Sequence, residues 1–141
     1  MPDLVAAMND SSSLVRNNAM RALMVFTRYL PKPPARKIQV PSQPLIALLN
    51  SCVWTDRNKS AAALAELTET RDSALLEKLR REAFPSLEEM ERWKNFGHAY
   101  DALKILGRIT GMTEEQLLKD LTSQSRRAIF AAAQIPRSPE D

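Results

Sequence analysis

The sequence predicts an all-α fold, and three observations support that prediction. Of the 141 residues, 18 are alanine and 18 are leucine, whereas valine and isoleucine together number only 11. This balance favours helices, because β-branched residues are the ones that fill strands. No segment alternates apolar and polar residues as a half-buried strand does. In addition, a pattern of two consecutive helices recurs along the chain.

Capping residues set the boundaries of the expected helices. Ser86 with Glu89 forms a capping box, in which each side chain satisfies a backbone N–H at the start of a helix. Thr113 with Gln116 forms a second capping box directly after Gly111, and glycine commonly ends a preceding helix. The expected helices lie near residues 3–9, 12–30, 43–51, 56–69, 73–83, 87–110 and 114–134.

Proline divides the chain after the second expected helix. Five of the nine prolines lie between residues 31 and 44. Proline removes a backbone donor and restricts the residue before it, so no helix runs through this stretch. We therefore expect an extended Pro-rich loop at 31–43, inside a single domain that covers residues 1–135. The tail 136–141 is expected to be disordered.

The composition narrows the possible functions. Cys52 is the only cysteine and His98 the only histidine, so we expect no internal disulfide, no metal site, no catalytic triad and no cofactor. No apolar run approaches the ~20 residues that a membrane-spanning helix needs. The first residues lack the basic and apolar segments of a signal peptide, which favours a cytoplasmic location.

An internal repeat underlies the predicted architecture. Residues 4–26 align with residues 45–67 without a gap at an offset of 41, and seven of 23 positions are identical. A weaker third copy follows, with 99–106 repeating 60–67 at an offset of 39. Repeats of about 40 residues made of two helices are typical of α-solenoids. The identical pairs that we assign to structural positions are Arg16 and Arg57, Ala22 and Ala63, and Leu23 and Leu64.

The residues of this repeat resemble those of HEAT repeats. Residues 10–23 read DSSSLVRNNAMRAL, and the family places an acidic residue in the turn, then Val-Arg, then Ala and Ala-Leu on the second helix. The second copy departs from this pattern, because Ser51 replaces the turn aspartate and Asp56 replaces the valine. The resemblance implies a right-handed superhelix of about three helical hairpins with a C-terminal capping helix. It also suggests the C-terminal part of a longer array.

The same resemblance implies that the second helix of each pair lines a concave binding face. Polar residues on these helices are the candidate binding surface: Asn17, Arg21, Arg28, Asn58, Lys94, His98 and Arg108. For Arg16 and Arg57 the alternatives are anion contacts in register or structural bonds to the adjacent repeat, and we favour the second. Val53 and Trp54 either pack onto the next repeat or contact a partner, and we favour packing.

Three functions are compatible with these observations. We favour a non-catalytic scaffold that binds another protein, since HEAT arrays are mostly binding scaffolds. The first alternative is a nucleic-acid-binding protein: the net charge is +3, and the basic excess lies in residues 16–37. The second alternative is a HEAT-like lyase or an enzyme accessory subunit, which rests on fold analogy alone.

Overall fold

The computed structural model describes residues 2–29 and 40–122, and every regular element in these two segments is helical. The prediction of an all-α protein is therefore confirmed for the described residues. A short 3-10 turn, Thr68–Thr70, follows the fourth helix. The α-helices are α1 (Pro2–Ala7), α2 (Ser13–Tyr29), α3 (Ser42–Leu49), α4 (Trp54–Leu67), α5 (Ser73–Glu91), α6 (Phe96–Ile109) and α7 (Glu114–Thr122).

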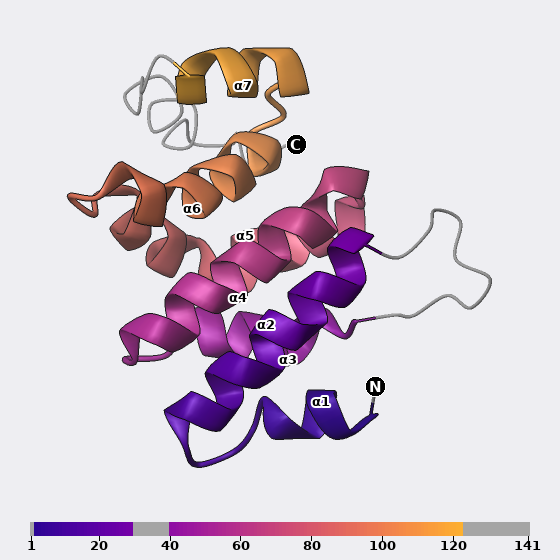
Figure 1. The fold of residues 1–141 in the computed structure, drawn as a ribbon. Helices are drawn as coiled ribbons and strands as arrows, with labels where there is room; N and C mark the ends of the chain where they lie inside the picture. The colour runs from indigo at the N-terminus through magenta and orange to yellow at the C-terminus, as the bar shows by residue number, and fades with distance from the viewer. Residues whose placement is uncertain (1, 30–39, 123–141) are drawn as a thin grey trace.

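The helices pack in consecutive pairs (Figure 1). Helix α1 packs on α2, α3 on α4, and α5 on α6. We call these the first, second and third pairs. Their second helices contact one another in the order α2, α4, α6, while α3 packs against α5 and α7 packs against α6. Helices α2 and α4 begin at Ser13 and Trp54, which are equivalent positions of the 41-residue repeat.

A continuous apolar core joins the three pairs. Each of α2 to α7 contributes at least one fully or almost fully buried leucine, and α1 is held by Met8, which follows it. Burying one such side chain contributes roughly 1.5–3 kcal/mol, so the pairs stabilise one another through many small terms. The central leucines of the core are Leu23, Leu45, Leu64, Leu79, Leu103 and Leu117.

The prediction for the third pair is wrong in its boundaries. We expected one helix to end at residue 83 and the next to begin at 87, but α5 runs without a break to Glu91 and contains Pro85. Ser86 therefore starts no helix: its hydroxyl donates to Asn50 Oδ1 at 2.6 Å. Asn50 Nδ2 in turn donates to the Glu82 carbonyl at 2.8 Å, in the turn that proline interrupts. Asn50 directly follows α3, so this contact ties the end of α3 to the proline-containing turn of α5; the bond that Pro85 itself cannot make would go to the Arg81 carbonyl.

The transition from α6 to α7 is as the sequence predicts. Gly111 adopts a positive φ of 82°, and the amide of Met112 donates to the Gly107 carbonyl at 3.0 Å. This is the Schellman ending of a helix. The capping box then forms in both directions, with the Thr113 amide bonded to Gln116 Oε1 and the Gln116 amide bonded to Thr113 Oγ1.

Helix α7 covers the end of α6 more narrowly than expected. We predicted a capping helix here; Leu117 and Leu121 are buried, whereas Leu118 is exposed. Most of the Pro-rich loop 31–43, the second half of the predicted helix 114–134 and the tail 136–141 lie outside the described residues. No helix in the described part of the chain is long and apolar enough to cross a membrane.

Candidate functional site

Arg16 links the first helical pair to the second. Its Nη2 donates to Asp56 Oδ2 at 2.7 Å and its Nε bonds both carboxylate oxygens at 3.1 Å. Its Nη1 donates to the carbonyls of Asp10 and Ser11. Asp56 is only 1% exposed and also accepts a bond from the Ser51 hydroxyl at 3.0 Å. Arg16 is thus committed to structural bonds with the adjacent pair, as we favoured.

Arg57 makes the corresponding link from the second pair to the third. Its Nη1 donates to Glu89 Oε1 at 2.9 Å and its Nη2 to the Ser86 carbonyl at 3.1 Å. The bond from Arg57 lowers the pKa of Glu89. The Arg57 guanidinium also lies 5.4 Å from the centre of the Trp93 ring, a cation–π distance. Both repeat arginines therefore bridge pairs.

Arg108 does not belong to an accessible binding surface, contrary to our prediction. Its side chain is 3% exposed, because α7 and the 3-10 turn cover it. It donates to the Ala65 carbonyl, to Thr68 Oγ1 at 3.0 Å and to Glu114 Oε1 at 2.9 Å. The hydrogen bond from Arg108, reinforced by one from Arg71, lowers the pKa of Glu114 against the opposing effect of burial. Arg108 fastens α7 to the third pair.

The remaining residues of the predicted surface do not form one site. Asn17 and Asn58 are half-buried, and Asn17 Oδ1 is buried without a hydrogen-bond partner. Arg21 and Lys94 are exposed. Arg28 lies in α2, but its side chain is outside the described part of the structure.

An aromatic notch does bring two of the predicted residues together. It has a volume of about 280 Å³ and is lined by Trp54, Trp93, Lys94, Asn95 and His98. The ring centres of Trp54 and Trp93 are 6.3 Å apart, and His98 meets Trp54 edge-on at 4.9 Å. Trp54 thus packs onto the third pair, as we favoured, yet remains 46% exposed. Trp93 falls within the helix predicted at 87–110, but it lies in the connection between α5 and α6.

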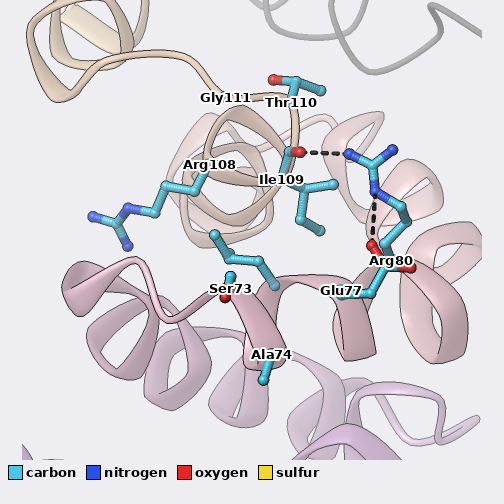
Figure 2. A pocket seen from close by; sticks show the side chains of 9 residues that line it. Ser73, Ala74, Glu77, Arg80, Arg108, Ile109, Thr110 and Gly111 are labelled. Carbon is cyan, nitrogen blue, oxygen red and sulfur yellow. Dashed lines mark hydrogen bonds and ion pairs between the residues drawn. The ribbon is translucent and has the colours of Figure 1, made fainter. Parts of the chain in front are cut away.

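A larger cavity of about 550 Å³ lies between the start of α5 and the end of α6 (Figure 2). Arg80 points into it and donates to the Ile109 carbonyl, while its Nε lies 3.9 Å from Glu77 Oε2. Arg108 extends away from Arg80 in this view. Ser73 is the only hydroxyl at the start of α5 that lines the cavity, and no histidine lines the cavity to act as its base. The arrangement holds two helix ends together and offers no paired nucleophile and base.

Helix α2 carries several large apolar side chains that are exposed. Leu14 and Val25 are 66% and 55% exposed, and Val15 and Phe26 are also exposed. We call these four residues the α2 surface. Leu14 is eleven residues from Val25, as Val15 is from Phe26, which is about three helical turns. The four side chains therefore lie on one side of α2 as two apolar groups, with the exposed Asn18 and Arg21 between them. Single exposed apolar residues are ordinary, but several large ones on the same side of a helix indicate a contact surface.

No group of three or more His, Cys, Asp or Glu side chains is placed to hold a metal ion within residues 2–29 and 40–122. Cys52 is exposed, as expected for the turn between α3 and α4. No protein-family model, curated protein or solved structure matches the chain.

Proposed function

We propose that this chain is a non-catalytic protein-binding scaffold of the α-solenoid type, built from HEAT-like helical pairs. The packing of α2 on α4 and of α4 on α6 supports this arrangement. The arginine links also support it, since Arg16 and Arg57 occupy equivalent repeat positions and each bonds to the following pair. In a solenoid each unit contacts only its neighbours, and its outer faces remain available to partners.

The α2 surface is the observation that carries the proposal. At the repeat offset of 41, Val15 corresponds to Asp56, the residue through which α4 receives Arg16 from α2. On α4, the side that carries Asp56 packs against the first pair. The equivalent side of α2 carries Val15, and it is apolar and has no described neighbour. A helix with an apolar face is the natural occupant, because it would pack on this side as α2 packs on α4.

The charge of α2 specifies the partner helix further. The helix contains three arginines and no acidic residue. Arg16 is paired with Asp56, while Arg21 is exposed beside the α2 surface. A second copy of this helix would bring like charges together. We therefore propose a partner helix whose apolar face is flanked by aspartate or glutamate.

Site-specific photo-crosslinking tests this proposal. A photoreactive amino acid replaces Leu14 in one variant and Leu118, an exposed leucine on α7, in a matched control. We expect a partner adduct at position 14 and none at position 118. The purified partner should then bind Val25→Glu at least tenfold more weakly than the unmodified protein. Equal adducts at both positions, a self-adduct, or equal affinity for Val25→Glu would contradict the proposal.

Nucleic-acid binding has less support. It relied on residues 16–37, in which Arg16 is bonded to Asp56 and 30–39 lie outside the described residues. Fluorescence anisotropy with labelled duplex and single-stranded DNA at ~50 and ~200 mM salt tests this alternative directly. Steeply salt-dependent binding that Arg21→Glu weakens would favour nucleic acid over the proposed helix.

A further inference from the structure

We infer that the aromatic notch binds a proline-rich segment of a partner protein in the polyproline II conformation. This site is separate from the α2 surface and does not depend on the function proposed for it. The notch forms where the start of α4 meets the connection between α5 and α6. The Trp54–Trp93 pair and the polar side chains of Lys94, Asn95 and His98 line it.

The polar groups of the notch are available to a ligand. Asn95 occupies the N-cap position of α6, where an asparagine normally accepts a bond from the helix backbone, but its side chain makes no capping bond. Among the residues that the structure covers, none accepts a hydrogen bond from the side chain of Lys94, Asn95 or His98, and none pairs with Lys94. These groups supply N–H donors beside an exposed indole.

The ring geometry excludes a nucleobase held between the tryptophans. A ring inserted between two others needs about 3.5 Å on each side, or roughly 7 Å in all. The two indole centres are 6.3 Å apart and their planes are tilted by 33°, so the rings already touch each other. A ligand can only lie across the exposed face of Trp54 and the edge of its neighbour.

The charges exclude an organic cation as the ligand. An aromatic cage for a quaternary ammonium group needs open ring faces and no competing positive charge. Here the Arg57 guanidinium already lies over Trp93 at 5.4 Å, and Lys94 stands at the rim. The site instead favours a neutral apolar group next to a negative charge.

A polyproline II segment matches these features. Its backbone has no internal hydrogen bonds, so its carbonyls are free to accept from Asn95, His98 and the indole N–H of Trp54. Proline rings present flat apolar faces to the indoles, and the rigid segment loses little conformational entropy on binding. The volume of about 280 Å³ accommodates a short anchor rather than a folded ligand. Lys94 favours an acidic residue beside the prolines.

Intrinsic fluorescence reports on this site, because Trp54 and Trp93 are the only tryptophans of the chain. We would titrate the full chain with a capped nine-residue peptide that contains six prolines and a glutamate at every third position. We expect a saturable change in tryptophan emission. A matched peptide with alanine in place of every proline should produce no saturable change.

Two variants locate the binding. Trp54→Ala should weaken the proline peptide at least tenfold, measured by calorimetry, with its fold checked by circular dichroism. Lys94→Glu, at an exposed position that leaves the fold intact, should weaken the glutamate-bearing peptide but not a neutral polyproline peptide. Leu118→Ala is the matched control and should leave both affinities unchanged. The inference is overturned by no saturation at millimolar peptide, by equal binding of the alanine peptide, or by saturation with an oligonucleotide alone.

Discussion

Replacing Asp56 by asparagine tests whether the arginine links hold the helical pairs together. Asp56 is 1% exposed and receives bonds from both Arg16 and Ser51. Asparagine removes the negative charge and turns an N–H toward the guanidinium, so a buried donor faces another donor. Breaking a buried ion pair costs about 3–5 kcal/mol. Because Arg16 keeps two backbone carbonyl acceptors, we expect the lower end, about 3 kcal/mol.

Urea unfolding followed by far-UV circular dichroism measures this loss. A domain of this size is stable by about 5–15 kcal/mol, so the expected change moves the midpoint clearly. A double-mutant cycle then isolates the pair. Arg16→Met combined with Asp56→Val leaves neither charge unpaired, and the double variant should lose about 1–3 kcal/mol less than the sum of the single variants. A loss below about 1 kcal/mol for Asp56→Asn, or strictly additive changes, would refute the reasoning.

Three further substitutions have defined outcomes in the same unfolding assay. Gly107→Ala places a Cβ 2.5 Å from Leu117 Cδ1. We expect the free energy of unfolding to fall by about 1–2 kcal/mol, which lowers the urea midpoint. An unchanged midpoint would mean that α7 shifts without cost. Pro85→Ala restores a helical donor, so we expect a gain of about 1–2 kcal/mol, and a loss would contradict our account of α5. The lowered pKa of Glu114 means that its stabilisation is present above the unfolded pKa of about 4.3 and disappears as the pH falls through the lower folded pKa. Glu114→Gln should therefore flatten the fall in stability between about pH 5 and pH 3, and parallel curves would contradict this.

Local signals in the sequence explain why most of the fold was predictable. The offset of 41 places the start of α4 relative to α2 correctly, because apolar periodicity and the turn residues recur together. Gly111 and the Thr113 capping box mark the end of α6 and the start of α7 for the same reason. Each of these features depends on residues within one or two helical turns.

The continuous α5 shows where local reasoning fails. Pro85 normally stops a helix, and the sequence around Ser86 offers a convincing new start. The contact that supports this turn, from Asn50 Nδ2 to the Glu82 carbonyl, comes from a residue 32 positions away that directly follows α3. Since no local pattern shows that Asn50 reaches this carbonyl, the boundary could not be derived from the sequence of α5.

Among the candidate site residues too, some roles could be predicted from local sequence and others could not. That Arg16 is structural could be inferred from its repeat position, but its partner Asp56 stands where the HEAT pattern has valine. Arg108 was misplaced, because the helical face that it shares with His98 gave no indication that α7 would cover it. The exposure of the α2 surface could not be predicted, because periodicity shows which side of a helix is apolar, not which neighbour lies against it.

The ion pairs of the arginine links limit which arginines can contribute to binding. Arg16, Arg57 and Arg108 are each paired with a carboxylate, so their charges are neutralised within the protein and the net charge of +3 resides on other residues. Both proposed surfaces combine apolar side chains with one or two cations. Partner binding should therefore weaken only several-fold between about 50 and 200 mM salt, since rim charges mainly affect the association rate. A loss of about 10³-fold or more over this range would indicate phosphate contacts, and it would place the function on a nucleic-acid surface instead.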